Sequence, residues 1–306
     1  MNMNYMGISN FTILDGTMKI KLLLTLAALS SMLIGCGGGM TRPVVTGDVS
    51  LKTESYTPST WDLPLGSVVP EGSNLVLHRQ PSKAVGLSVL FGPLGVVIAN
   101  ESLKSSTKEK VSALDSLRTL KAKIESDKLL AKLINDPTLG LNAALNSSAK
   151  NEHHFVLKPF ILLEADRESS AQISVMLKLE EKNGKNEGWK GQYVRHLPEK
   201  LSLVALSNND VSVDAEKIKQ DTLDGLKLVL RVMLMDLNGK IDAAEKEVQF
   251  KQNNVIAWNF ADKLKGRKVG YLDDKYLLIR TNFGSAIPFI YGTHILDKDQ
   301  VTILSE

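Results

Sequence analysis

Residues 171–180 read AQISVMLKLE, and this stretch decides the type of fold that the sequence predicts. Every second residue from Ile173 to Leu179 is apolar, whereas Ser174 and Lys178 fall on the alternate positions. A period of two places successive side chains on opposite faces of a strand. The stretch therefore predicts a β-strand with one face turned to an apolar core.

Two further strands are expected on either side of this one. Phe155–Glu164 is apolar almost throughout, and Trp189–His196 follows a polar loop that contains Asn183-Gly184. Because the connections are short, the three strands are expected to form an antiparallel meander. Asn74–Arg79 is a candidate for an earlier strand.

Amphipathic helices are expected to cover this meander. Val213–Leu237 carries an apolar stripe with helical spacing, and Asn238-Gly239 marks its end. A second helix is expected to start at Asn100 and to run to about Ile124, and a shorter one follows the Ser126-Asp127 cap.

The chain after residue 250 has a different sequence pattern, with short apolar runs separated by turn residues. Five runs are candidate strands: VIAWNF (255–260), KVGY (268–271), KYLLIR (275–280), AIPFIYG (286–292) and QVTIL (300–304). Five strands in about fifty residues are typical of a small barrel. The predicted fold class is therefore α+β: an antiparallel β meander packed by two or more amphipathic helices, with a small C-terminal SH3-like β barrel or meander.

The N-terminus carries an export signal. Lys19 and Lys21 precede an uncharged run of 13 residues, Leu22–Ile34, and the small Gly35 comes just before Cys36. An uncleaved membrane helix needs about 20 apolar residues, so this run is too short to cross a bilayer. Cleavage is therefore expected between Gly35 and Cys36.

The sequence Leu33-Ile34-Gly35-Cys36 resembles the lipobox of bacterial lipoproteins. The resemblance implies that the Cys36 thiol receives diacylglycerol and that the freed amine is acylated, for example with palmitate. In that family an aspartate just after the cysteine favours retention in the inner membrane, and this chain has Gly37. The resemblance thus implies a lipid-anchored protein of the outer membrane that faces the periplasm or the cell surface.

These observations divide the chain into five segments. Residues 1–17 are a misassigned start or a leader extension, and residues 18–35 are the lipoprotein signal peptide. Residues 36–72 form a tether and an extended lead-in, rich in Gly and Pro. Residues 73–250 form the α+β domain, and residues 251–306 form the small C-terminal β domain.

An uncharged stretch, Ala84–Ala99, has two interpretations. It is either a hairpin that dips into a bilayer or docks a partner, or a buried strand and turn. Gly92-Pro93 divides it into pieces too short to span a membrane, which favours the buried strand and turn.

Composition excludes several classes of protein. The net charge of +3 in 306 residues is too small for a nucleic-acid binder, so no nucleic-acid partner is expected. The chain has one cysteine, which permits no internal disulfide and no multi-cysteine zinc site. No metal or other cofactor is expected.

No motif identifies a reaction. A zinc site or a catalytic site requires two or more histidines that converge in the fold. The five histidines of this chain are interpreted as surface or strand-edge residues. A zinc site formed by two histidines distant in the sequence remains an alternative. Lys263, Lys265, Arg267 and Lys268 form the densest basic cluster. This cluster is either an anionic-ligand site or a solvated turn.

Two functions remain open. The first is a non-enzymatic binding or assembly module, anchored to the membrane through acyl chains on Cys36 and contacting an envelope protein partner. The alternative is an envelope hydrolase that acts on peptidoglycan, lipid or glycan. A cleft that holds two acids or a Ser-His pair would favour the hydrolase.

Overall fold

The computed structural model describes residues 45, 49–56, 67–70, 74–79, 124–141, 153–166, 170–183, 186–202, 214–241, 246–258, 262–281 and 291–305. The strands are β1 (Val49–Thr53), β2 (Leu75–Arg79), β3 (His153–Ala165), β4 (Ser170–Asn183), β5 (Asn186–Ser202), β6 (Lys246–Gln252), β7 (Leu264–Leu272), β8 (Tyr276–Thr281), β9 (Gly292–Asp297) and β10 (Val301–Ser305). The α-helices are α4 (Ser126–Leu133) and α7 (Ala215–Leu237), and the short 3₁₀ helices are η4 (Ile256–Trp258) and η5 (Lys298–Gln300).

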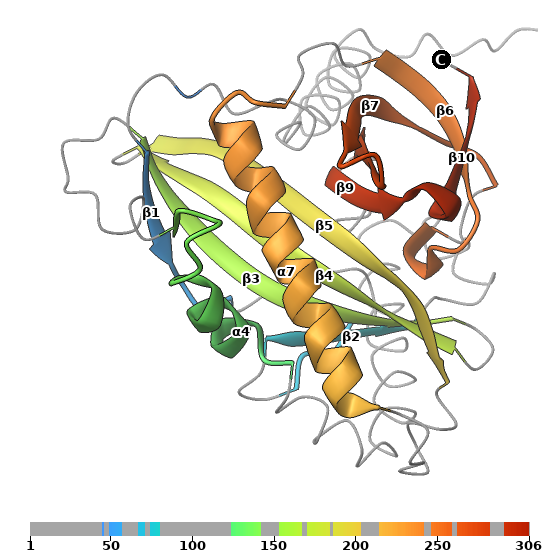
Figure 1. Cartoon of the computed structure of the whole chain (residues 1–306), viewed down its shortest axis with the longest axis horizontal. Helices are drawn as coiled ribbons and strands as arrows, with labels where there is room; N and C mark the ends of the chain where they lie inside the picture. The colour runs from blue at the N-terminus through green and yellow to red at the C-terminus, as the bar shows by residue number, and fades with distance from the viewer. Residues whose placement is uncertain are drawn as a thin grey trace, which may run out of the picture. The chain divides into compact units, whose positions relative to one another are not determined.

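The ten strands of the described residues belong to one mixed sheet. Figure 1 shows how these strands are arranged. The strand order is β1-β3-β4-β5-β9-β8-β7-β6-β10, and β2 also pairs with β3. Strands β3, β4 and β5 are antiparallel neighbours. Strands β1 and β2 each pair with β3 in parallel, and the β5–β9 pair is also parallel.

The predicted α+β class is wrong, because the described chain is mostly β and its C-terminal strands continue the first sheet. Strand β9 pairs with β5 in parallel, with Tyr193 opposite Thr293. A parallel pair between segments a hundred residues apart leaves no local signature, so the sequence suggested a separate small barrel. Of the predicted helices, α4 and α7 are found, and residues 100–123 lie outside the described ranges.

Helix α7 forms where its periodicity predicted, and its ends are defined by local hydrogen bonds. The Asp214 carboxylate accepts the backbone N–H groups of Glu216 and Lys217, both at 3.0 Å. At the other end the chain turns at Gly239, whose φ of +63° suits glycine. The predicted stop at Asn238-Gly239 is confirmed.

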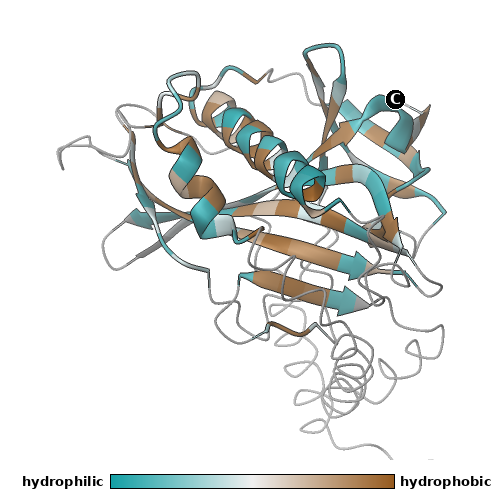
Figure 2. Ribbon diagram, turned by 60° about the horizontal axis from the view of Figure 1, so that its bottom comes forward, coloured by the Kyte–Doolittle hydropathy of each residue, from teal (hydrophilic) through white to brown (hydrophobic). Residues whose placement is uncertain are grey.

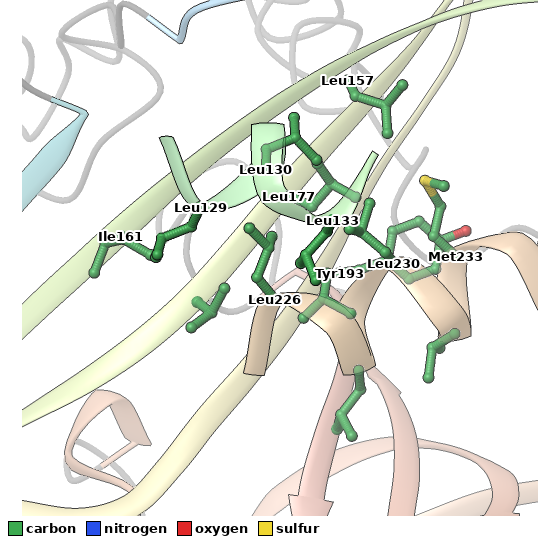
Figure 3. Packing of buried hydrophobic residues seen from close by; sticks show 14 of the residues in the cluster. Leu129, Leu130, Leu133, Leu157, Ile161, Leu177, Tyr193, Leu226, Leu230 and Met233 are labelled. Carbon is green, nitrogen blue, oxygen red and sulfur yellow. The ribbon is translucent and has the colours of Figure 1, made fainter. Parts of the chain in front are cut away.

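In the described residues, the first core lies between α4, α7 and strands β3, β4 and β5, and it also includes residues of β7, β8 and β9. Both helices cover one face of the sheet (Figure 2). Leu129 and Leu133 from α4, Leu230 from α7 and Leu177 from β4 belong to this core, in which Leu129 lies beside Ile161 of β3 (Figure 3). Gly225 lets α7 approach closely, since a Cβ atom there would lie 3.1 Å from side-chain atoms of β4 and β5.

A second core, which contains Phe250 and Trp258, lies among the C-terminal strands. Figure 1 shows that these strands curl round. The predicted strand at 255–260 is wrong: its first part is the 3₁₀ helix η4. The Gln252 side chain accepts the Val255 N–H at 3.0 Å, which turns the chain and places Trp258 fully inside. Of the run at 286–292, only residues 291 and 292 are described.

Candidate functional site

The lipobox and the stretch 84–99 lie outside the described residues, so the lipidation of Cys36 stays a prediction. The predicted basic cluster lies in and just before β7. Lys263 and Lys265 are exposed, whereas Arg267 and Lys268 are half-buried. The residues between them, at 264 and 266, are buried. Lys265 and Arg267 alternate with buried residues of β7, and the role of the cluster as an anionic-ligand site stays a prediction.

Three Ser-His pairs are present in the described chain, and the hydrolase hypothesis requires one in a cleft. Ser50 Oγ lies 2.6 Å from His154 Nδ1 on the exposed edge formed by β1 and β3. Ser67 Oγ lies 3.3 Å from His78 Nδ1, and both residues are buried. The third pair, which involves His196, belongs to a longer buried chain.

We define the buried histidine chain as Ser174, His196, His294 and Thr281. Ser174 Oγ lies 2.8 Å from His196 Nδ1, and His196 Nε2 lies 3.0 Å from His294 Nδ1. His294 Nε2 then lies 3.0 Å from Thr281 Oγ1. The two imidazole rings stack, and each meets Trp258 edge to face. All four residues are at most 1% exposed, so this serine cannot reach a substrate in this state.

The burial of His78, His196 and His294 corrects the expectation of surface or strand-edge histidines for these three residues, whereas His154 is exposed. Burial lowers the pKa of His196 well below its usual value, and the neighbouring His294 and Arg195 lower it further. At neutral pH the His196 ring is therefore uncharged, and its two nitrogens hold neighbouring strands together. The chain runs from β4 through β5 and β9 to β8, across the junction between the two cores.

His78 and Glu164 form a second buried titratable pair, on paired positions of β2 and β3. Burial raises the pKa of Glu164 to about 8 and lowers the pKa of His78 to about 4. At neutral pH the 3.8 Å contact therefore joins two neutral groups rather than an ion pair. Glu164 is 4% exposed, which is too buried for an open catalytic acid.

A buried ion pair fixes α7 to the C-terminal strands. Arg280 of β8 donates to Asp236 Oδ1 at 2.7 Å, and the Tyr193 hydroxyl donates to Asp236 Oδ2 at 2.9 Å. Arg280 and Asp236 are 1% and 2% exposed. Charges this deep persist only when they are paired, so this contact is a structural connection between the two halves of the sheet.

An open cleft of about 360 Å³ lies beside this junction. The N-terminal half of α7, the end of β5, the start of β8 and the end of β9 surround it. We call it the mixed-charge cleft. Its lining is Arg195, Leu197, Pro198, Glu199, Lys217, Asp221, Asp224, Gly225, Leu228, Lys275, Tyr276 and Asp297.

The inner wall of the mixed-charge cleft is fixed by Arg195. Its guanidinium donates to Asp297 at 2.5 Å and to the Ile295 carbonyl oxygen at 3.3 Å. The Arg195 Cζ atom also lies 4.9 Å from the centre of the Tyr276 ring. A cation paired with a carboxylate and placed over an aromatic ring has little freedom, so this wall is preorganised.

The outer rim carries the remaining charges. Lys217 pairs with both Glu199 and Asp221, which raises the pKa of the lysine. Lys275 lies 5.0 Å above the Tyr276 ring, and hydrogen bonding to that tyrosine raises the pKa of Lys275. Asp224 accepts a hydrogen bond from Gln220 at 3.1 Å. The cleft therefore offers both signs of charge to solvent.

The described residues contain no group of three or more His, Cys, Asp or Glu side chains placed to hold a metal ion. Within the same ranges, no helix is long and apolar enough to cross a membrane. Comparison with family models, curated proteins and solved structures gave no match to this chain.

Sequence reasoning missed the mixed-charge cleft entirely. One signal was present in the sequence, because Arg195 lies next to Val194 inside a predicted strand. A charged side chain in a strand that packs into a core requires a buried partner of opposite charge. The identity of that partner, Asp297, depends on the β5–β9 pairing and was not accessible from the sequence.

Proposed function

We propose that this protein is a lipid-anchored, non-enzymatic binding module of the cell envelope, cleaved before Cys36 and held to the outer membrane by acyl chains. The lipobox-like sequence Leu33–Cys36 supports the anchor. The run of three glycines at 37–39 supports the proposal of a tether between the lipid and the domain.

The mixed-charge cleft is the observation that carries the binding role. Its volume of about 360 Å³ falls within the usual range of small-ligand sites. Its inner wall is held by the Arg195–Asp297 pair before any ligand arrives. A rigid concave surface with fixed charges lowers the ordering cost of binding, which suits a receptor or carrier.

The hydrolase alternative finds less support in the same cleft. Three of its four carboxylates, those of Glu199, Asp221 and Asp297, are ion-paired within it. Paired carboxylates suit the binding of a polar ligand better than proton transfer, which requires an acid or base free to reach the substrate. The Ser174–His196 pair is buried away from solvent.

Labelling with radioactive palmitate tests the anchor directly. Cells that express the natural chain are expected to yield a labelled protein in the outer-membrane fraction, and a Cys36→Ser form is expected to take up no label and to leave that fraction. Unchanged labelling or partitioning of the Cys36→Ser form would contradict the proposal. In-cell crosslinking of the anchored protein then identifies what it contacts, and recovery of lipid alone would count against an assembly role.

A further inference from the structure

The charges of the mixed-charge cleft do not balance one another. Its lining contains four carboxylates and three cations. Arg195 pairs with Asp297, and Lys217 pairs with Glu199 and Asp221. Among the described residues, Lys275 and Asp224 are the two lining charges that take part in no ion pair within 4.0 Å. The cleft thus presents one ammonium and one carboxylate that a ligand of opposite charge can reach.

These two groups come from different walls. Lys275 precedes β8 and is held over the Tyr276 ring, which also lies under Arg195. Asp224 lies on α7 beside Gly225, the residue at which the helix approaches β4 and β5 closely. A ligand that reached both would bridge the helix and the sheet across the opening.

The sign of each charge limits which ligands fit. A purely anionic molecule would be attracted to Lys275 but would meet a lining with more carboxylates than cations. A purely cationic molecule would be attracted to Asp224 but would meet Arg195 and Lys275. Mismatched charges oppose binding, so the lining selects against both classes. A molecule with one charge of each sign satisfies both walls.

We propose that the mixed-charge cleft binds a small zwitterion, namely an amino acid or a short peptide with free ends, whose carboxylate pairs with Lys275 and whose ammonium group pairs with Asp224. This inference rests on the proposed binding role and names its ligand class. The cleft volume accommodates a molecule of this size. The Leu228 side chain in the lining offers an apolar contact for the ligand's aliphatic part.

Titration calorimetry on the full acylated protein in detergent micelles tests this proposal. The probe is alanyl-alanine with free ends, and the controls are its N-acetyl and C-amide forms, which each lack one charge. Alanyl-alanine is expected to bind at least about tenfold more tightly than either control, since loss of one charge-assisted contact costs about one decade of affinity. Equal binding of a blocked form would overturn the zwitterion assignment.

Two variants locate the contacts. Lys275→Met and Asp224→Asn are each expected to weaken alanyl-alanine binding about tenfold and to leave the circular dichroism spectrum unchanged, because both side chains are exposed. Lys251→Met and Asp262→Asn change exposed charges outside the cleft and are expected to leave affinity unchanged. If alanyl-alanine does not bind, or binds the cleft variants equally, the inference fails. Palmitate labelling and crosslinking then decide the proposed function separately.

Discussion

The two apolar cores of this protein are closed in different ways. The first is covered by α4 and α7, which pack leucines against β3, β4 and β5. The second is enclosed by strands that curl around Phe250 and Trp258. Between them lies what we call the polar seam: the buried histidine chain together with the Arg195–Asp297 and Asp236–Arg280 pairs.

The two parts of the sheet are joined by directional polar contacts and also by the first core, which includes Leu278 of β8 and Ile295 of β9. Only three residue pairs, beginning with Tyr193 and Thr293, connect β5 to β9. Buried polar groups at such a junction are costly unless each is satisfied, so the seam specifies one docking geometry. The mixed-charge cleft opens where the Arg195–Asp297 pair of this seam reaches the surface.

Removal of one seam charge is expected to have the largest effect. Asp236→Ala leaves Arg280 buried without its carboxylate, and the free energy of unfolding is expected to fall by about 3–5 kcal/mol. Guanidinium denaturation followed by circular dichroism measures the loss. The double variant Asp236→Leu/Arg280→Met removes both charges and is expected to recover most of it. A loss below about 1 kcal/mol in the single variant would show that the pair is not buried as described.

Truncation in each core comes next. Leu230→Ala in the first core and Leu296→Ala in the second each remove a fully buried side chain. Each is expected to lower the free energy of unfolding by about 2–5 kcal/mol. If the seam couples the halves, both variants lower the midpoint of the whole transition. A variant that shifts only part of the unfolding signal would show that the two cores unfold independently.

A change at Gly292 probes the β5–β9 contact itself. Its φ is +119°, and an added Cβ atom would lie 2.4 Å from the Gln192 backbone oxygen. Gly292→Ala is therefore expected to cost about 1–3 kcal/mol through overpacking. Gly140→Ala is the control, since that glycine also has a positive φ but a Cβ there meets nothing within 4 Å. Equal losses for the two variants would mean that β9 does not lie against β5 so closely.

The β2–β3 pair should also carry a pH dependence of its own. Burial raises the pKa of Glu164 from 4.5 to about 8, so the folded form keeps a proton that the unfolded chain has lost. The free energy of unfolding is therefore expected to fall by about 1–2 kcal/mol as pH rises from about 6.5 to about 8. Burial lowers the pKa of His78 from 6.5, so this residue makes the free energy of unfolding rise with pH. That effect is confined to pH values below about 6.5. Glu164→Gln is expected to flatten the profile at neutral to alkaline pH, and an unchanged slope would contradict this assignment.

The smallest effect is expected on the cleft rim. Lys217→Ala removes two exposed ion pairs, with Glu199 and Asp221, and is expected to change the free energy of unfolding by less than about 1 kcal/mol. Thermal unfolding at low and high salt provides the measurement. A loss of unfolding free energy as large as that expected for Asp236→Ala would show that these rim ion pairs stabilise the fold as strongly as the polar seam does.

Local patterns predicted the elements of the first core well. The alternation from Ile173 to Leu179 predicted β4, and the stripe on Val213–Leu237 predicted α7 within two residues. Both patterns arise from one apolar face, which sequence periodicity reports directly.

The seam and the cleft escaped prediction for a physical reason. In strand β9 the buried positions include the polar residues Thr293 and His294, so the strand shows no alternation of apolar and polar residues. Its partner β5 lies about a hundred residues earlier in the sequence. Strand β1 and strand β6 were also missed. A polar group that is satisfied by a distant strand looks like a surface residue until the pairing is known.

The most direct test of the seam is the unfolding of the full chain followed by two probes at once. In a Trp61→Phe/Trp189→Phe background, fluorescence reports Trp258 in the second core, and far-ultraviolet circular dichroism reports mainly α7 on the first. Coincident midpoints and slopes in guanidinium are expected, since the seam and the first core, which includes residues of β7, β8 and β9, make the two parts of the sheet one cooperative unit. Two separated transitions would contradict that account and would favour an independently folding segment at residues 251–306.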